Sequence, residues 1–294
     1  MKTKLFLLCA LVLVVVLVLA VVRYVSAPKE FVVIATSDTH NCGTAAKQTA
    51  NLLDTFPSDT LILQSGDMTE NGTLSEFNDC FALTRASHKS QYRPVPGNRE
   101  YLMPGASGYW DYFGTLAGTR DQGYYSFNLG AWHIVALNSE IDHSASSAQV
   151  QWLKTDLAAN TSQCTLAYWH KPRFSSGAGH GSETSVAPLW DVLYAAHADV
   201  IFNGHDHDYE RFAKQNPSSE PDANGIREFV IGTGGGLLYN FRITLANSEV
   251  RDRTTYGIVK FTLRAGSYDW QFVPVAGLTF TDSGTTQCNP KPGR

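Results

Sequence analysis

Short apolar runs and helical patterns alternate along the chain after residue 30. Residues 31–35 and 60–64 form apolar runs that predict buried strands, and residues 44–53 between them have helical spacing. A strand, a helix and a second strand in this order are typical of a βαβ unit. Further patterns predict a short strand ending at Val95, a hairpin at 123–137, helices at 148–157 and 186–196, and strands at 164–169, 200–202, 229–231 and within 257–274.

The balance of these elements changes along the chain. Strands and helices alternate at first, and strands dominate later. This order favours two packed sheets flanked by helices, because each sheet must cover its apolar faces with another layer. The predicted fold class is therefore α/β with α+β character.

An apolar block precedes this region. Residues 5–22 are 18 consecutive apolar residues, with Lys2 and Lys4 before them. This length lies between a long signal-peptide core and a short membrane span, and the two lysines favour a cytoplasmic N-terminus. We expect residues 1–27 to be a signal peptide or an N-terminal membrane anchor, and residues 28–294 to form a single domain. The domain would then be extracytoplasmic: secreted, periplasmic or anchored in the membrane through this segment alone.

Composition narrows the class of protein further. The 294 residues include 43% apolar and 17% charged residues, with a net charge of −4, which excludes a disordered chain. Without the leader, 20 basic and 27 acidic residues remain, so the domain carries a charge of −7. No basic stripe is present for binding nucleic acid, and no nucleic-acid partner is expected. Nothing in the sequence fixes the oligomeric state, although we favour a monomer.

Four cysteines follow the leader. An even number of cysteines in an exported chain predicts disulfides, but four cysteines allow three pairings and the sequence does not choose among them. Their spacing fits no zinc-ribbon pattern. These cysteines are Cys42, Cys80, Cys164 and Cys288.

Polar clusters follow five of the predicted strands. In open α/β sheets, binding sites collect beyond the carboxyl ends of strands, so the five loops are expected to converge. Carboxylate, amide and imidazole ligands without thiolate suit Zn, Mn or Fe, and seven ligands are enough for two ions that share a carboxylate. The candidate ligands are Asp38, His40, Asp67, Asn98, His170, His205 and His207.

These clusters occur in the order of a known set of motifs. The sequence has Asp-x-His, Gly-Asp, Gly-Asn, a lone His and Gly-His-x-His in that order after strands, and thereby resembles the calcineurin-like metallophosphoesterase superfamily over residues 31–231. Residues 169–177 and 232–235 look like those of exported bacterial phosphatases in this superfamily. The resemblance implies a four-layer αββα sandwich of two mixed sheets and hydrolysis of a small phosphate ester. Monoesters and diesters both remain open as substrates.

The resemblance also implies a division of the ligands between two divalent or trivalent ions, with Mn, Zn, Fe or a mixture as candidates. The first ion would take Asp38, His40 and His207. The second would take Asn98, His170 and His205, and Asp67 would bridge the two ions. A hydroxide between the ions would be the nucleophile, because metal coordination lowers the pKa of water towards neutrality.

Two positions depart from the family patterns. Arg99 follows Asn98 where the superfamily has a histidine that is thought to assist the leaving group. Arginine can bind phosphate oxygens but does not readily give up a proton, so we expect slower turnover of poor leaving groups. Purple acid phosphatases carry a tyrosine where this chain has Glu70, so we expect a branch distinct from these enzymes, without their colour.

Another residue could replace the missing proton donor. His180 lies in a glycine-rich loop after the motif of His170, and we predict that it contacts substrate together with Asn98 and Arg99. Arg99 and His180 are thus the candidate catalytic side chains, with a solvent-exposed loop histidine as the alternative for His180. If Arg99 has abolished efficient catalysis, the alternative function is a surface protein that binds metal and phosphate.

Four further polar residues are expected to lie outside the ligand set. Asp206 alternates with two ligands, so we expect it to point away from the metals, beside the ligands or at the surface. Asp208 and Glu210 are predicted to be surface or ion-pairing residues. His133 lies within an apolar alternation and is predicted to be a core histidine.

Overall fold

The computed structural model of the protein describes residues 29–291. The predicted signal peptide or anchor lies outside the described residues and stays a prediction. None of the helices between residues 29 and 291 combines the length and apolar character that crossing a bilayer requires.

Six strands form the first sheet, in the order β13-β12-β11-β1-β2-β3. Its parallel half contains the predicted βαβ unit, because β1 pairs with β2 in parallel and β2 pairs with β3 in parallel. Its other half is antiparallel, so the sheet is mixed. The strands are β1 (Phe31–Thr36), β2 (Leu61–Ser65), β3 (Tyr92–Val95), β11 (Gly257–Arg264), β12 (Ser267–Pro274) and β13 (Ser283–Gln287).

Seven strands form the second sheet, in the order β10-β8-β9-β7-β6-β5-β4. The four central strands β5, β6, β7 and β9 are parallel, and antiparallel strands flank them on both sides. The strands are β4 (Tyr125–Leu129), β5 (Trp132–Ala136), β6 (Cys164–Tyr168), β7 (Val200–Asn203), β8 (Tyr209–Phe212), β9 (Arg227–Ile231) and β10 (Ser248–Asp252).

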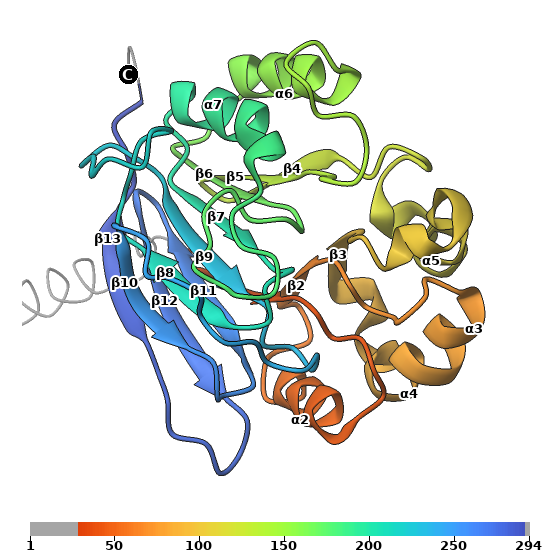
Figure 1. The fold of residues 1–294 in the computed structure, drawn as a ribbon. Coiled ribbons are helices and arrows are strands. Elements are labelled where there is room, and N and C mark those ends of the chain that lie inside the picture. The colour runs from red at the N-terminus through yellow and green to blue at the C-terminus, as the bar shows by residue number, and fades with distance from the viewer. Residues whose placement is uncertain (1–28, 292–294) are drawn as a thin grey trace, which may run out of the picture. The chain divides into compact units, whose positions relative to one another are not determined.

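Helices cover the outer face of each sheet (Figure 1). Helix α2 (Thr44–Leu53) and the short helices that follow β2 and β3 pack on the first sheet, and α6 (Ala148–Ala159) and α7 (Ala187–Ala195) pack on the second. The short helices are α3 (Leu74–Glu76), a π-helical turn (Phe77–Phe81), α4 (Ala82–Arg85) and α5 (Ser107–Phe113). Short 3₁₀ segments lie at Ala86–Gln91, Glu100–Leu102, Pro104–Ala106, Gly114–Ala117 and Thr184–Val186.

The apolar core has three parts, as this layering requires. Val33 of β1 packs between the sheets, while the next residue, Ile34, packs under the helices of the first sheet. Ile134 and Val135 of β5 divide in the same way between the central layer and the helices α6 and α7. Strands buried on both faces read as continuous apolar runs, which explains the sequence pattern. The predicted four-layer αββα sandwich of two mixed sheets is confirmed.

Two disulfides resolve the pairing that the sequence leaves open. Cys42 pairs with Cys80, with Cα atoms 5.5 Å apart, and ties the start of α2 to the π-helical turn. Cys164 pairs with Cys288, with Cα atoms 5.7 Å apart, and ties β6 to the C-terminal segment. The carboxylate of Asp199 lies near Cys164 and Cys288, but sulfurs joined in a disulfide are not thiolate ligands, so this group is no metal site.

Candidate metal centre

Five loops bring the seven predicted ligands to one place between the two sheets. The loops follow β1, β2 and β3 of the first sheet and β6 and β7 of the second. Hydrogen bonds join them: His40 N donates to the main-chain Asp67 O at 3.1 Å, and His205 N donates to the Asp38 carboxylate at 2.9 Å. The predicted convergence of these loops is therefore present.

The carboxylates and imidazoles form two groups whose ligand atoms lie within 4.8 Å of one another. The first group is Asp38, His40 and His207, as the resemblance implies for one ion. The second is Asp38, Asp67 and His170. Asp38 belongs to both groups, whereas Asp67 belongs only to the second.

His207 is oriented within the first group by a main-chain carbonyl. Its Nδ1 donates a hydrogen bond to Leu237 O at 2.8 Å, so the neutral ring presents the Nε2 lone pair to the cluster. That Nε2 lies 3.4 Å from Asp38 Oδ1. The ring of His40 lies beside it, with centroids 4.9 Å apart, and His40 Nδ1 is buried without a hydrogen-bond partner.

His170 is oriented in the same way within the second group. Its Nδ1 donates to Ser65 O at 2.8 Å, which leaves Nε2 as the acceptor of the neutral ring. Three other acceptor-bearing groups face that Nε2: Asn98 Oδ1 at 3.1 Å, Asp67 Oδ1 at 3.3 Å and His205 Nδ1 at 3.2 Å. Lone pairs gathered so closely need a cation or a proton between them.

The donor set therefore fits metal ions. Oxygen and nitrogen ligands in buried, preoriented positions suit Zn, Mn or Fe, and the second ring nitrogens of His170 and His207 are held by carbonyls, as is usual for metal-bound imidazoles. Asp38, Asp67 and His205 also have positive φ angles of 53°, 50° and 71°, a strained conformation for residues other than glycine. Such strain concentrates at functional sites.

Burial and the neighbouring carboxylates and imidazoles shift the pKa values of the clustered residues. Burial alone would raise the pKa of Asp38, but the hydrogen bond and charge of His207 lower it well below its ordinary value. Burial alone would lower the pKa of His170, but the carboxylate of Asp67 raises it to about 10. Burial, together with His170 and His180, lowers the pKa of His205 to about 2, so His205 is a neutral imidazole that can donate a lone pair.

Comparison with known proteins agrees with this geometry. Residues 31–209 match the family model described as calcineurin-like phosphoesterase. The chain belongs to the calcineurin-like phosphoesterase family. The matched segment holds every predicted ligand, and its end coincides with β8, directly after the last motif.

Relatives of known name within this family are plant purple acid phosphatases. The chain is 38% identical to purple acid phosphatase 15 of Arabidopsis thaliana over 124 residues, which are 40% of this chain and 23% of that protein. It is 29% identical to purple acid phosphatase 22 of the same plant over 175 residues, which are 54% of this chain and 38% of that protein. The chain thus matches less than half the length of these relatives.

Solved structures share the fold. Purple acid phosphatase PPD1 from yellow lupin superposes with a TM-score of 0.77 at 18% identity, covering 90% of this chain and 55% of that chain. GAP50, the anchor in the inner membrane complex of Plasmodium, superposes with a TM-score of 0.69 at 15% identity, covering 90% of both chains. At these identities the similarity concerns the phosphoesterase fold alone.

Arg99 lies at the edge of the candidate metal centre. Its Nε is 3.4 Å from Asp67 Oδ2, its main-chain N donates to Asp67 Oδ1 at 3.0 Å, and its Nη1 pairs with the carboxylate of Glu70. The side chain is 27% exposed, so solvent reaches it. Glu70 thus holds Arg99, the residue that departs from the phosphoesterase motif, beside the cluster. Glu70 is the residue at the position where purple acid phosphatases have a tyrosine.

His180 and Tyr239 cover two of the ligand rings. The ring of His180 stacks on the ring of His205, with centroids 3.8 Å apart and planes at 21°. The ring of Tyr239 stacks on His207, with centroids 4.2 Å apart and planes at 11°. His180 is exposed and next to the cluster, as its predicted contact with substrate requires. Tyr239 was not among the predicted site residues, because nothing in its local pattern distinguishes it from a loop or core aromatic.

Glu100 is a second residue that sequence reasoning missed. Its buried carboxylate accepts hydrogen bonds from the main-chain N atoms of Asp67 and Gly97, at 2.9 and 2.8 Å, and from Met68 N at 2.8 Å. It therefore joins the loops after β2 and β3, which carry Asp67 and Asn98. Burial and the neighbouring Asp67 raise the pKa of Glu100 to about 8. The signal in the sequence was its place in the Gly-Asn-Arg-Glu cluster.

The prediction that Asp208 and Glu210 are surface or ion-pairing residues was wrong. The expectation that His133 is a core histidine is confirmed. Glu210 lies on β8, between β10 and β9 of the second sheet, and Asp208 directly precedes that strand; both side chains are completely buried. Asp206 is completely buried as well, so its place is beside the ligands rather than at the surface. His133 is 5% exposed and bonds through Nε2 to Asp156 at 2.7 Å.

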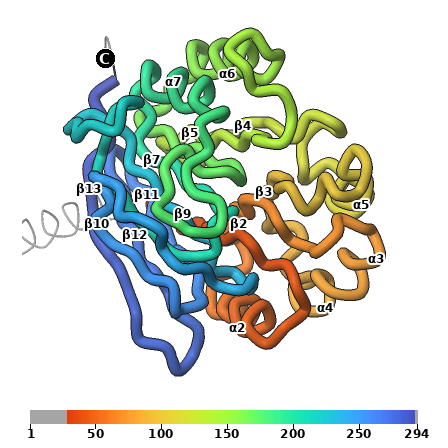
Figure 2. The backbone as a smooth tube through the Cα atoms, in the orientation of Figure 1, coloured from red at the N-terminus to blue at the C-terminus, as the bar shows by residue number. Residues whose placement is uncertain are grey.

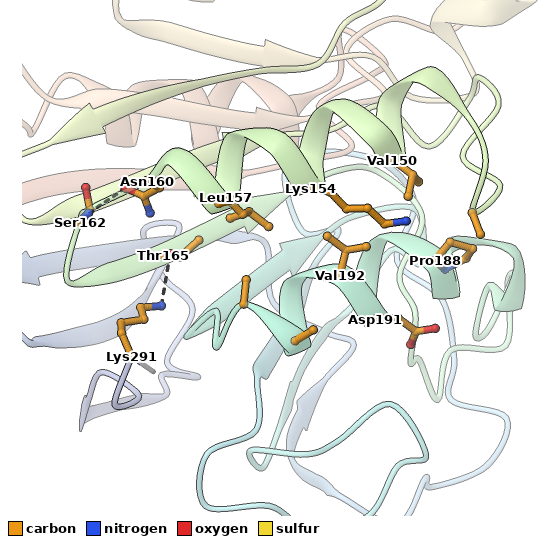
Figure 3. A pocket seen from close by; sticks show the side chains of 14 residues that line it. Val150, Lys154, Leu157, Asn160, Ser162, Thr165, Pro188, Asp191, Val192 and Lys291 are labelled. Atoms are coloured by element: carbon orange, nitrogen blue, oxygen red, sulfur yellow. Dashed lines mark hydrogen bonds between the residues drawn. The ribbon is translucent and has the colours of Figure 1, made fainter. Parts of the chain in front are cut away.

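A separate groove of about 640 Å³ lies between α6 and α7 (Figure 3). Apolar side chains such as Leu157 and Val192 line it together with Lys154 and Lys291. None of the nine predicted site residues lines this groove. The candidate chemistry of the protein is therefore at the loop cluster between the sheets.

Proposed function

We propose that the chain hydrolyses phosphate esters with two metal ions held by the loop cluster between its sheets. One ion would be bound by Asp38, His40 and His207, and Asp67 would lie between the two ions. The ligands of the second ion would be Asn98, His170 and His205. The observation that carries the proposal is the arrangement at His170, whose Nε2 faces Asn98, Asp67 and His205 at 3.1 to 3.3 Å while its Nδ1 is held by a carbonyl.

The metal ions would activate water and stabilise the charge of the transferring phosphoryl group. The protein side chains have separate tasks around them. His170 and His207 keep one ring orientation because main-chain carbonyls hold their Nδ1 atoms, so the cluster is preorganised. Arg99, with Asn98, would bind phosphate oxygens through its guanidinium, which matches the geometry of such oxygens. His180 would give a proton to the oxygen of the leaving group.

The substrate class follows from charge. The domain is acidic outside the cluster, and its described residues place Arg99 and Lys171 near the metal ligands. A small anionic ester can enter such a site more easily than a polyanion, so nucleic acid is not expected as a substrate. Phosphomonoesters are the first candidates and phosphodiesters the second. We further propose that the domain acts outside the cytoplasm as a monomer.

The test is hydrolysis by the purified full chain after loading with Mn, Zn or Fe. We expect turnover of 4-nitrophenyl phosphate, with bis(4-nitrophenyl) phosphate as the diester probe. The matched control is Asp67→Asn, which retains the size of the side chain but removes its charge. Activity no greater than that of the control, with two metal ions bound, would support the alternative function, a surface protein that binds metal and phosphate without efficient catalysis.

A further inference from the structure

The loop that carries His180 is held from below by three buried carboxylates. It runs from Lys171 to Glu183, between β6 and the 3₁₀ turn before α7, and contains no helix or strand. The backbone tube of Figure 2 shows it in green beside β9. The three carboxylates, each 0% exposed, are Asp206 after β7, Glu210 on β8 and Glu228 on β9.

Glu228 and Glu210 bind the first half of this loop. Glu228 accepts hydrogen bonds from the main-chain N atoms of Arg173 and Phe174, at 2.9 and 3.1 Å. Glu210 accepts from both the N and the Oγ of Ser176, at 2.7 and 2.6 Å. These bonds satisfy main-chain groups that a loop without secondary structure cannot pair within itself.

Asp206 binds the half of the loop that contains His180. Its Oδ1 accepts a hydrogen bond from His180 N at 2.8 Å. Its Oδ2 accepts from Gly181 N at 2.8 Å and from Ser175 Oγ at 2.6 Å. All of these bonds have a carboxylate acceptor, and hydrogen bonds of this class are stronger than those between neutral groups.

The space around Asp206 is closely filled. A Cβ atom at Gly177 would overlap the carboxylate of Asp206, so the loop passes this carboxylate only because residue 177 is glycine. Asp206 is also the residue between the candidate ligands His205 and His207. Residues 205–207 therefore direct the His205 and His207 rings towards the metal cluster and the Asp206 carboxylate towards the loop of His180.

His180 is therefore connected to the ligand motif through two direct contacts. The main-chain N of His180 is held by Asp206, and the His180 ring stacks on His205 at a centroid distance of 3.8 Å. A side chain that meets the substrate has to be held close to its productive position, because a displacement of about 1 Å can cost roughly 10²-fold in rate. A loop without these bonds would sample many conformations.

We propose that Asp206 is a positioning residue that holds His180 over His205 at the mouth of the metal centre. The proposal rests on the proposed function for the part that concerns catalysis. The other part of the proposal is that the Asp206 carboxylate orders residues 175–181, and it rests only on the hydrogen bonds to that carboxylate. The two parts need separate measurements.

The first measurement is hydrogen–deuterium exchange of the full chain and of the Asp206→Asn variant. An asparagine side chain has only one acceptor oxygen, so at least one of the three hydrogen bonds to Asp206 is lost. His180 N and Gly181 N bond to different oxygens of Asp206, so the amide nitrogen of the variant replaces the acceptor of one of them. We expect exchange at His180 or at Gly181 to be at least tenfold faster in the variant, with the metal content unchanged. The matched control is Glu228→Gln, which should speed exchange at Arg173 or Phe174 but leave His180 and Gly181 protected. Unchanged exchange at both His180 and Gly181 in Asp206→Asn, or loss of metal, would overturn the proposal.

The second measurement is a kinetic double-mutant cycle with His180→Ala. With an alkyl phosphate, we expect Asp206→Asn to lower kcat by about 10- to 100-fold, a range that corresponds to a displaced proton donor. In the His180→Ala background the same change should alter kcat less than about threefold, because the residue that it positions is absent. A full additional loss in that background would mean that Asp206 acts on the ligands or on folding, and it would overturn the proposal.

A fallback variant and the exchange experiment keep failure of this proposal distinguishable from failure of the proposed function. If Asp206→Asn does not fold, Ser175→Ala removes one donor from the Asp206 carboxylate and should give smaller changes in the same direction. If the metal-loaded chain hydrolyses no phosphate ester, the proposed function fails. The exchange experiment still decides whether Asp206 orders the loop of His180.

Discussion

The Nδ1 atom of His170 donates a hydrogen bond to the main-chain carbonyl of Ser65, across 2.8 Å and between the two sheets. Ser65 is the last residue of β2, and His170 follows β6 by two positions. The bond orients the ring so that Nε2 faces Asp67, Asn98 and His205. The fold thereby holds the candidate ligand His170 in one ring orientation.

Replacing His170 should weaken metal binding more than it weakens the fold. In His170→Ala, we expect the affinity for the second metal ion to fall at least tenfold, because one preoriented ligand is lost. Metal content after dialysis against a chelator buffer of defined free metal concentration measures this effect. His133→Ala is the control, since His133 is a buried histidine outside the cluster. Equal metal affinity in wild type and His170→Ala would exclude His170 as a ligand.

Arg99→His should give the leaving group a second proton donor in addition to His180. Histidine can transfer a proton near neutral pH and arginine cannot, and general acid assistance typically contributes about 10²–10⁴-fold. We expect the variant to raise kcat for an alkyl phosphate at least tenfold more than kcat for 4-nitrophenyl phosphate, whose leaving group needs little assistance. Arg99→Lys keeps a positive charge and serves as the control. Equal gains on both esters, or none, would contradict a leaving-group role for this position.

Asp282 should make stability depend on pH in the acid range. Its carboxylate accepts from Tyr209 Oη at 2.7 Å, Arg211 Nε at 2.6 Å and Trp270 Nε1 at 3.0 Å, and so links β8 of one sheet to β12 of the other. Burial alone would raise the pKa of Asp282, but the bonds from Arg211 and Tyr209 lower it below its ordinary value. The charged carboxylate therefore stabilises the fold above the unfolded-state pKa, and this contribution is lost as the pH falls through the folded-state pKa.

The variant Asp282→Asn measures this contribution. We expect the free energy of unfolding to fall by roughly 2–4 kcal/mol at pH 7, because the buried Arg211 loses one of its two charged partners and keeps only the more exposed Glu249. The difference from wild type should stay constant down to about pH 5 and shrink below about pH 4, where Asp282 of the unfolded chain is protonated. Urea unfolding of the metal-free protein at several pH values reports it. A difference that grows as the pH falls would contradict the predicted sign.

The two disulfides should differ in their contribution to stability. Cys164–Cys288 spans 124 residues and Cys42–Cys80 spans 38, and a longer loop loses more entropy when it is closed in the unfolded chain. On the chain-entropy model, replacing the first pair with alanines should cost roughly 4–5 kcal/mol, about 1 kcal/mol more than replacing the second pair. Urea denaturation of the two double variants under non-reducing conditions measures both values. A larger loss from the shorter loop would show that native packing, rather than loop length, dominates.

The sequence predicted the layers and most of the ligand cluster for one physical reason. Strands buried on both faces read as apolar runs, and each run ends at a polar motif, so both the strands and the loops beyond them are visible in the pattern. Asp38, His40 and His207 meet as the motifs imply. The hairpin of β4 and β5 was visible in a different pattern, the alternation of apolar residues, and α6 and α7 were visible as helical segments.

What the sequence missed depends on contacts between segments far apart in the chain. The pairing of Cys164 with Cys288 is decided by where the C-terminal segment passes β6. Tyr239 reaches His207 only because the loop after β9 folds back over the cluster. Asp206 was expected beside the ligands or at the surface, and its burial under the loop of His180 could not be read from an acidic residue between two histidines.

The central claim is that two metal ions at this cluster make the chain a phosphate ester hydrolase. The direct measurement is turnover of 4-nitrophenyl phosphate by the metal-free full chain as Mn, Zn or Fe is added in known equivalents, with bound metal counted in the same samples. We expect activity to rise until two ions are bound per chain, and we expect Asp67→Asn neither to reach this stoichiometry nor to approach this activity. Activity that is complete with one ion bound, or absent with two, would contradict it.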